Sequence, residues 1–355
     1  MNPSGYRIGV VGCGAVAAYG HLPAIAETPQ LRLTALLDPD PERLAEVGRT
    51  YGLPDEALCT EPEAFYAHKL DAVSVTSPAP AHRQNVLDAV AHGVPILCEK
   101  PLAMDRDEAR DMVEAADDAG VMLAVAFCYR YSPAAQLIKR LVDESAIGDL
   151  RTLRLVFNWA CHGATLDGGA PCDPAVAGSR AAAAQRRAGR MLEGGPMVDC
   201  GTHQIDLAQW WTGSPVAEVA GHGSWVEGFD APDHVWAHLD HENGAHTVVE
   251  ISFSYGHTTP HLPKHFRYEL IGTRGVIEYD REARSLLLHN AEGEHVLPFA
   301  PEKNFAGAYA CFVRSLHAGE IDPDLVDGWL AMETTRLARA STEQAIARRS
   351  AVRTD

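Results

Sequence analysis

Long hydrophobic runs are absent from this sequence of 355 residues, in which no stretch reaches the ~18 apolar residues that a membrane span requires. The first residues carry no basic segment, and the apolar stretch Ile8–Val11 is far shorter than the hydrophobic region of a secretory signal. We therefore expect a cytoplasmic protein that has no membrane partner.

Positive charge is also scarce. The sequence has 30 Lys and Arg against 48 Asp and Glu, a formal net charge of −18 with His neutral. Such a chain repels a phosphate backbone, so we expect no nucleic-acid partner. No two cysteines have the C-x-x-C spacing of many metal and redox sites. We expect reduced and mostly buried thiols at Cys13, Cys59, Cys98, Cys128, Cys161, Cys172, Cys200 and Cys311.

The composition that is present, 46% hydrophobic and 22% charged, is that of a globular protein, and the length suggests two domains. From Tyr6 to about Phe127, short β-branched runs alternate with amphipathic helical patterns. This alternation predicts a doubly wound α/β domain with a parallel sheet. The predicted strands are Arg7–Val11, Arg32–Leu37, Ala72–Thr76, Pro95–Cys98 and Val121–Phe127, and the predicted helices are Ala15–Glu27, Pro41–Tyr51, Pro80–His92 and Arg106–Ala119.

After Tyr129 the pattern changes to that of an α+β domain with an open, mainly antiparallel sheet. A long segment, Asn158–Gly189, is predicted to be irregular. The predicted elements are a helix at Pro133–Glu144, a strand at Leu150–Phe157, a helix from near Asp199, successive strands from Ala217 to Leu297, and helices at Phe305–Ala318 and Leu325–Arg348. We divide the chain into residues 1–127, residues 128–324, and a closing helical segment, 325–355, that packs back on the first domain.

A glycine-rich turn follows the first predicted strand. Gly12-Cys13-Gly14-Ala15-Val16-Ala17 has the pattern G-x-G-x-x-A and opens a helix. In such a turn the first glycine permits the bend and the second lets the backbone approach a pyrophosphate at the helix N-terminus. Asp38 follows the second strand, where its carboxylate would accept hydrogen bonds from the ribose hydroxyls of an adenosine and repel a 2′-phosphate. The glycine turn together with Asp38 favours NAD over NADP as the cofactor. The alternative is a plain strand–helix turn with Asp38 as a helix cap.

Two further patterns carry titratable groups. Glu99-Lys100-Pro101 ends the fifth predicted strand, and the carboxyl ends of parallel strands open into the crevice where such sheets bind ligands. The alternative is that the Lys100 side chain only extends into solvent and binds no ligand. In the second half, Asp199, His203 and Asp206 fall on one face if a helix begins near Asp199. The imidazole would then exchange a proton with a substrate hydroxyl. The alternative is a capping aspartate with a structural histidine.

Together these motifs resemble those of the glucose–fructose oxidoreductase, inositol dehydrogenase and MocA family of NAD(P)-dependent oxidoreductases. The likeness extends nearly end to end. Glu99-Lys100-Pro101 combined with the later D-x-G-x-H-x-x-D of Asp199–Asp206 is its most specific part. Thr76-Ser77-Pro78 with His82, Tyr129-Arg130 and the closing Asp327-Gly328 also match. One departure is Ala79, where family members often carry Asn.

The resemblance implies a Rossmann domain that binds NAD, followed by a domain that binds substrate and forms the oligomer. It implies that Lys100 hydrogen-bonds the reacting oxygen, that His203 is the acid/base, and that Asp199 positions His203. Lys100 and His203 would converge on one substrate oxygen. The implied cofactor contacts are Gly12, Gly14, Ala15, Val16, Asp38, Ser77, Pro78, His82, Glu99 and Lys100, and the implied substrate contacts are Lys100, Arg130, Asp199, His203 and Asp206.

The expected function is an NAD-dependent dehydrogenase or ketoreductase that acts on a secondary hydroxyl of a sugar, cyclitol or glycoside. A second hypothesis is a redox-neutral lyase, epimerase or glycosidase that uses NAD transiently. A third is a non-catalytic NAD-binding sensor. We expect a homodimer or a homotetramer, because an exposed sheet face commonly mediates association.

Other patterns are weaker. His257, His261 and His265 would form a metal stripe on a helix, but Pro260 and Pro263 exclude that helix. Cys161 and His162 with Cys172 form a loop zinc candidate. The hydride chemistry needs no metal, so none is expected. Four arginines, Arg180, Arg186, Arg187 and Arg190, could bind an anionic substrate from a lid, or they could lie on a solvated helix; we favour the solvated helix. Trp210 and Trp211 are predicted to be core or domain-interface residues.

Overall fold

The computed structural model describes residues 5–161, 180–259 and 261–352, with the backbone alone over 180–184. Contacts divide the chain into two units, each made of two segments. The first unit contains residues 1–131 and 303–335, and the second contains residues 132–302 and 336–355. No helix of the described residues is both long enough and apolar enough to cross a membrane.

The first unit is built on a seven-stranded sheet in the order β15-β6-β5-β4-β1-β2-β3, parallel except for β15. This is the predicted doubly wound arrangement. Its elements are β1 (Tyr6–Val11), η1 (Ala17–His21), α1 (Leu22–Glu27), β2 (Leu31–Leu37), α2 (Pro41–Tyr51), η2 (Asp55–Ala57), β3 (Leu58–Cys59), α3 (Pro62–Tyr66), β4 (Ala72–Val75), α4 (Ala79–Ala91), β5 (Ile96–Glu99), α5 (Arg106–Ala119), β6 (Leu123–Ala126), α9 (Phe305–Ala318) and β15 (Val326–Asp327).

Helices cover both faces of this sheet, which explains why its strands are almost uniformly apolar. One buried cluster joins the strands to α3, α4 and α5 through side chains such as Phe65, Val86 and Met112. The other joins them to α1, α2 and α9 through side chains such as Ile25, Leu44 and Phe312.

Local signals fix several helix ends at the predicted residues. The side chain of Asp40 caps α2 by accepting hydrogen bonds from the backbone of Glu42 and Arg43, and Pro41 occupies the first turn. Gly52, in the left-handed conformation, ends the helix. Asp105 and Gly120 bound α5 in the same way.

The second unit contains an eight-stranded sheet in the order β14-β13-β12-β11-β7-β10-β9-β8. It is mainly antiparallel, as predicted, but β7 and β10 pair in parallel. Its elements are α6 (Pro133–Asp143), β7 (Leu150–Asn158), α7 (Arg180–Leu192), η4 (Met197–Gly201), α8 (Thr202–Thr212), β8 (Val216–Ser224), β9 (His234–His241), β10 (His246–Ser252), β11 (His265–Gly272), β12 (Gly275–Asp280), β13 (Ser285–Asn290) and β14 (Gly293–Val296). Helix α10 (Gly328–Val352) begins in the first unit and ends in the second.

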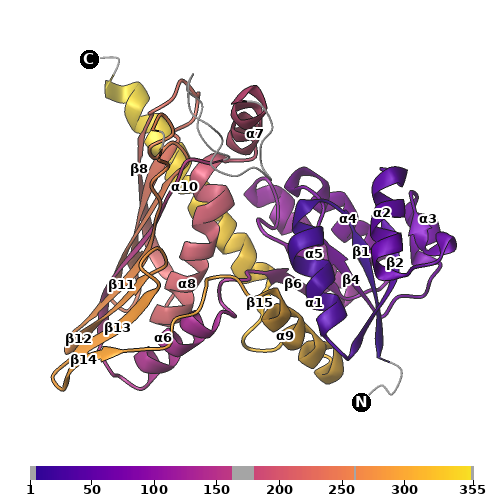
Figure 1. Cartoon of the computed structure of the whole chain (residues 1–355), viewed down its shortest axis with the longest axis horizontal. Coiled ribbons are helices and arrows are strands. Elements are labelled where there is room, and N and C mark those ends of the chain that lie inside the picture. The colour runs from indigo at the N-terminus through magenta and orange to yellow at the C-terminus, as the bar shows by residue number, and fades with distance from the viewer. Residues whose placement is uncertain (1–4, 162–179, 260, 353–355) are drawn as a thin grey trace. The chain divides into compact units, whose positions relative to one another are not determined.

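The two faces of the second sheet differ. Alternate residues such as Leu155, Val249 and Phe266 are buried on the face covered by α6 and α8, and the residues between them are partly exposed on the open face. In Figure 1, α6 and α8 lie along one side of the orange strands. This alternation is that of a sheet with one face on a core.

The structure corrects three predictions. The irregular segment Asn158–Gly189 contains part of α7, because alanine and arginine are strong helix formers. The segment from Lys303 belongs to the first unit, where the division at residue 324 had placed it in the second, since Ala308 and Phe312 of α9 join the first core. The start of the predicted last helix forms β15, which pairs with β6.

Helix α10 protects the edge strand β8 through an unusual contact. The side-chain amide of Gln344 accepts a hydrogen bond from the Gly221 amide at 2.8 Å and donates one to the Val219 carbonyl at 3.2 Å. A Cβ at Gly221 would overlap the backbone carbonyl of Ser341. The close approach of helix and strand therefore depends on glycine here.

We expect Gly221→Ala to lower the free energy of unfolding by about 1–3 kcal/mol, the usual cost of overpacking, because the backbone of α10 has to move away. Urea unfolding followed by circular dichroism measures this change. The matched control is Gly228→Ala, where a Cβ would meet no atom within 4 Å. Equal stability of the two variants would contradict the close packing of α10 on β8.

Candidate active site

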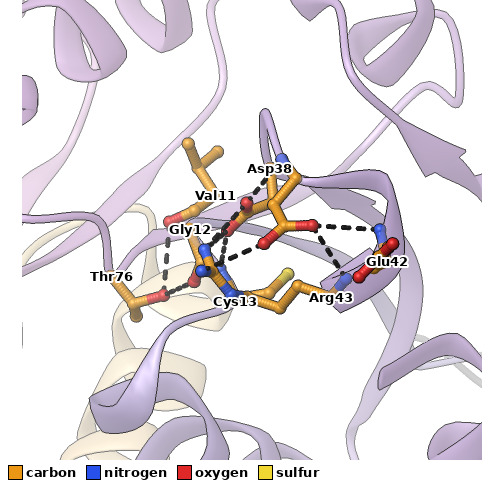
Figure 2. A network of polar contacts seen from close by, with 8 residues as sticks. Val11, Gly12, Cys13, Asp38, Glu42, Arg43 and Thr76 are labelled. Carbon is orange, nitrogen blue, oxygen red and sulfur yellow. Dashed lines mark hydrogen bonds and ion pairs between the residues drawn. The ribbon is translucent and has the colours of Figure 1, made fainter. Parts of the chain in front are cut away.

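The glycine turn joins the ends of three strands of the first unit. Gly12 has a φ of +88°, and a Cβ there would collide with the backbone of Ser77, so glycine is required. Its amide donates to the Leu37 carbonyl at 2.8 Å. The Thr76 hydroxyl donates to the Gly12 carbonyl at 2.5 Å (Figure 2). The turn is held from β2 on one side and from β4 on the other. The sequence motif included Thr76 but assigned it no role.

Asp38 lies beside this turn, as predicted. Its side chain is almost completely buried, and one carboxylate oxygen accepts the Cys13 amide at 2.7 Å. The other oxygen accepts the Asp40 amide at 2.9 Å. The guanidinium of Arg43, from the first turn of α2, lies 3.1 Å from the same oxygen (Figure 2). Asp38 thus joins the glycine turn to α2.

Arg43 and Cys13 complete the electrostatics around Asp38. Sequence reasoning missed Arg43, although its place in the first turn of the helix after Asp38 was visible. The guanidinium is about half exposed, and the charge of Asp38 is the largest cause of its raised pKa. Burial, and then the charge of Asp38, raise the pKa of the Cys13 thiol to about 12, so this thiol stays protonated and does not act as a nucleophile.

His82 connects the loop after β4 to the corner after β5. Its Nε2 lies 2.8 Å from the Ser77 carbonyl, and its Nδ1 lies 3.0 Å from the Pro101 carbonyl. Burial is the main cause that lowers the pKa of His82, which favours the neutral ring. Pro78 caps α4 in the same loop, and Ala79 begins that helix. Ser77, Pro78 and His82, all predicted cofactor residues, therefore lie together.

Glu99 is the centre of a buried polar network at the end of β5. One carboxylate oxygen lies 2.8 Å from Nε2 of His21, and the other accepts the backbone amide of Lys100 at 2.9 Å. Nδ1 of His21 lies 2.8 Å from the hydroxyl of Tyr309, which in turn lies 2.7 Å from that of Ser74. The network fixes the backbone at the point where Lys100 leaves the sheet.

The π-helical turn η1 presents His21 to this network, and α9 supplies Tyr309. Burial raises the pKa of Tyr309, so its hydroxyl stays protonated and can donate. Sequence reasoning missed both residues. The predicted cofactor contact of Glu99 stays a prediction, since both of its oxygens have partners within the chain. Arg130, a predicted substrate contact, is buried in the turn after β6.

The second unit carries the predicted Asp199–Asp206 group on one helical segment. This segment begins at Gly195, earlier than expected, and widens into the π-helical turn η4 before α8. A Cβ at Gly201 would overlap the Met197 sulfur, so glycine permits this turn. His203 and Asp206 are buried, and Asp199 is partly exposed.

The arginines of α7 are less solvated than predicted. Arg187 is completely buried: its Nε donates to the Cys161 carbonyl at 2.8 Å, and Nη1 pairs with Glu227 at 2.6 Å. It therefore belongs to the core and offers no grip for an anionic substrate. Arg190 is half exposed and lies 3.8 Å from the Asp199 carboxylate, whose charge is the largest cause of the raised pKa of Arg190. Asp199 thus has a cationic neighbour that sequence reasoning did not assign to it.

Trp211 is buried, donates to the Ala135 carbonyl and is a core residue, as expected. The seven described cysteines are buried with free thiols. His162 and Cys172 of the zinc candidate lie outside the described residues, as does the Arg180 side chain. Lys100 belongs to the first unit and His203 to the second, so their convergence stays a prediction.

Comparison with known proteins identifies the family. The model of an oxidoreductase family with an NAD-binding Rossmann fold, Gfo/Idh/MocA, matches residues 6–127, and the C-terminal domain model of that family matches residues 135–278. This chain belongs to the Gfo/Idh/MocA family. Both the suspected family and the fold class are therefore confirmed.

Named relatives in the family are sugar and cyclitol dehydrogenases. A scyllo-inositol 2-dehydrogenase (NAD(+)) of Bacillus subtilis is 28% identical over 279 residues, which cover 76% of this chain and 72% of that protein. A D-apiose dehydrogenase of Paraburkholderia graminis is 29% identical over 297 residues, which cover 83% and 73%.

Solved structures share the fold. Aldose-aldose oxidoreductase from Caulobacter crescentus has a TM-score of 0.78 at 23% identity and covers 96% of this chain and 97% of its own. An oxidoreductase from Agrobacterium radiobacter, solved with NAD+, L-tartaric acid and magnesium, has a TM-score of 0.76 at 22% identity and covers 96% of both chains.

The first unit of this Gfo/Idh/MocA chain fits the NAD that the family binds. A Cβ at Gly14 would meet no atom of the described chain within 4 Å, so the turn offers open space next to its backbone. The helix that starts at Ala15 and Val16 directs its amides toward that space, where a pyrophosphate is stabilised. Asp38 supplies acceptor oxygens for ribose hydroxyls at the neighbouring strand end.

We expect Asp38→Ala to weaken NADH binding by about 10–100-fold, the cost of losing hydrogen bonds to a charged acceptor. The same change should reduce the preference over NADPH, because Arg43 loses the Asp38 carboxylate, keeps only its pairing with Asp40, and can bind a 2′-phosphate. Fluorescence titration with both dinucleotides measures this without a substrate.

The double variant Asp38→Ala/Arg43→Ala separates the two effects. It should bind NADH as weakly as the single variant and lose the gain in NADPH binding. An unchanged ratio of NADH to NADPH affinity in Asp38→Ala would contradict the assignment of Asp38 to the ribose.

Proposed function

We propose that this chain is an NAD-dependent dehydrogenase or ketoreductase that acts on a secondary hydroxyl or ketone of a sugar, cyclitol or glycoside. The observation that carries the proposal is the position of Lys100 at the carboxyl end of β5, with its backbone held by the buried Glu99 network. The same sheet edge carries the glycine turn and Asp38. The names of the two dehydrogenase relatives support the substrate class.

Bound NAD supplies a nicotinamide ring that accepts hydride from the carbinol carbon or returns it to a ketone. The ammonium of Lys100 donates a hydrogen bond to the reacting oxygen and stabilises negative charge that develops there. A fixed donor of this kind contributes roughly 3–4 kcal/mol in comparable sites. His203 takes the hydroxyl proton in oxidation and gives it back in reduction.

The carboxylates have supporting roles in this proposal. Asp199 orients the His203 ring, and the guanidinium of Arg190 lies 3.8 Å from the Asp199 carboxylate. Asp206 accepts a hydrogen bond from a second hydroxyl of the substrate, and Arg130 lies among the substrate contacts.

The direct test is absorbance of reduced nicotinamide with a panel of sugars, inositols and glycosides. We expect NADH to accumulate with at least one polyol, because hydride leaves the substrate for good. Product without an absorbance change would instead show a lyase, epimerase or glycosidase that returns the hydride. Dinucleotide binding with no product from any compound would show a sensor and contradict catalysis.

Single and double substitutions test the two main roles. Lys100→Ala and His203→Ala should each lower kcat by about a hundredfold or more with little change in NADH affinity, because both groups act on the reacting oxygen. The double variant should lose less than the product of the two single effects, since both groups serve one step.

Lys139→Ala, which removes a lysine paired with Asp143 on α6, is the matched control and should retain full turnover. Wild-type kcat in Lys100→Ala would reject its role. Strictly multiplicative losses in the double variant would place Lys100 and His203 in separate steps.

Assembly and location belong to the same proposal. We propose a homodimer or homotetramer that uses the open face of the second sheet, and light scattering of the purified protein distinguishes the two. The seven described cysteines, buried and free, suit a reducing compartment such as the cytoplasm.

A further inference from the structure

A chain of four buried polar side chains leads to the residue before Lys100. Ser74 on β4, Tyr309 on α9 and His21 on η1 are completely buried, and Glu99 at the end of β5 is 5% exposed. The two hydroxyls are 2.7 Å apart, and that of Tyr309 lies 2.8 Å from Nδ1 of His21. Nε2 of His21 lies 2.8 Å from the carboxylate. We call these four residues the Glu99 network.

The hydrogen bonds of the Glu99 network run in one direction. A carboxylate only accepts, so Nε2 of His21 carries the proton that Glu99 accepts. A neutral imidazole has no second proton, so its Nδ1 is an acceptor. Burial raises the pKa of Tyr309, whose hydroxyl therefore stays protonated and donates to Nδ1. The Ser74 hydroxyl then donates to the oxygen of Tyr309. Each donor has one acceptor, and the chain ends on Glu99.

An aromatic ring helps to keep this network dry. Phe305 of α9 packs edge-on against the His21 ring, with the centroids 5.0 Å apart. A Cβ at Gly20 would overlap the Phe305 ring, so glycine allows this close approach. Gly20 and His21 belong to the π-helical turn η1, and such turns are frequent at functional sites. Away from water, hydrogen bonds to a charged group are strong, and the loss of one partner is costly.

The backbone on both sides of Lys100 is held by a histidine. Before Lys100, His21 fixes one oxygen of Glu99, and the other oxygen accepts the Lys100 amide at 2.9 Å. After Lys100, Nδ1 of His82 lies 3.0 Å from the Pro101 carbonyl. A donor that is aimed at a reacting atom has to be held in this way, because a displacement of about 1 Å can slow a reaction about 100-fold.

We propose that His21 and Tyr309 are positioning residues for Lys100, which they reach through the carboxylate of Glu99. Both are completely buried, so they act on Glu99 and not on the substrate. His21 keeps its proton at Nε2 during the reaction and transfers none. The inference rests on the proposed function, in which Lys100 donates to the reacting oxygen. It deepens that function by giving η1 and α9 a part in placing the lysine.

Tyr309→Phe is the first test variant, because it removes only the hydroxyl that holds Nδ1 of His21. We expect kcat to fall about tenfold, the effect of one hydrogen bond lost from a buried network. NADH affinity should stay the same, because the glycine turn and Asp38 are intact. His21→Leu removes both hydrogen bonds of the ring and should lower kcat about a hundredfold. Steady-state kinetics with an oxidised polyol and fluorescence titration with NADH measure the two quantities.

His21→Gln separates positioning from proton transfer. The glutamine amide offers an N–H donor for Glu99 and a carbonyl acceptor for Tyr309, but it does not titrate. It should therefore recover most of the wild-type kcat and leave the pH profile of kcat unchanged. A kcat as low as that of His21→Leu, or the loss of one limb of the pH profile, would show that His21 exchanges protons and would overturn the assignment.

An NMR signal from Lys100 tests the inference without a substrate. The sequence contains five lysines, which are Lys69, Lys100, Lys139, Lys264 and Lys303. Reductive methylation with isotope-labelled formaldehyde gives each lysine a separate signal, and Lys100→Arg identifies that of Lys100. We expect this signal to move in Tyr309→Phe and in His21→Leu, because the lysine changes its surroundings. The signals of Lys139 and Lys264, which lie in the second unit, should stay in place.

The matched control is Tyr66→Phe. Tyr66 is also a buried tyrosine of the first unit, but its hydroxyl has no hydrogen-bond partner among the described residues. Both kcat and the Lys100 signal of this variant should equal those of the wild type. Circular dichroism verifies that each variant is folded.

The outcomes separate this inference from the proposed function. Wild-type kcat in both Tyr309→Phe and His21→Leu, or an unmoved Lys100 signal in both, would overturn the inference and leave the dehydrogenase in place. An equal loss of kcat and NADH affinity would show a general disturbance of the first unit and would also overturn it. If the wild type oxidises no polyol, the proposed function fails, and the Lys100 signal alone decides whether His21 and Tyr309 position the lysine.

Discussion

The buried carboxylate of Asp38 is the interaction on which the cofactor edge of the first unit depends. Its two oxygens hold the Cys13 amide of the glycine turn and the Asp40 amide and Arg43 guanidinium of the next helix. A buried carboxylate is tolerated only where it is hydrogen-bonded in this way. The first two strand–helix units are thereby locked together before a dinucleotide arrives. Little reorganisation is then needed on binding.

Glu99 holds a second part of the same sheet edge in place, at the end of β5. A charge at the end of β5 is costly to bury, and His21 and the Lys100 amide provide its partners. Because Tyr309 and Ser74 extend the network, α9 is tied to the centre of a sheet from which it is remote in sequence. The segment that returns to the first unit after residue 302 therefore contributes to the Glu99 network at the end of β5 as well as to the hydrophobic core.

Sequence patterns predicted the structural features that depend on residues close together in the chain, such as helix ends and the glycine turn. Helices α2, α5 and α9 have the predicted bounds because capping side chains and terminal glycines lie within a few residues of each end. Gly12 and Asp38 were recognisable because the strand–turn–helix pattern places them. The roles of His21 and Tyr309 were not, since the two residues are 288 positions apart and meet only in the fold. The long range of such contacts is the physical reason that local periodicity misses them.

Arg187 shows a second limit of sequence reasoning, and the second sheet shows a third. An arginine in an alanine-rich helix is usually solvated, yet Glu227 and the Cys161 carbonyl satisfy Arg187 in the core, and neither partner is near it in sequence. On the sheet, alternation reveals which residues face the core, but not which strands become neighbours. His222, His238 and His246 are spread over 25 residues, and only the order β8-β9-β10 brings the ring of His238 beside each of the other two. The covered face is constrained by packing against α6 and α8, whereas the open face tolerates polar side chains.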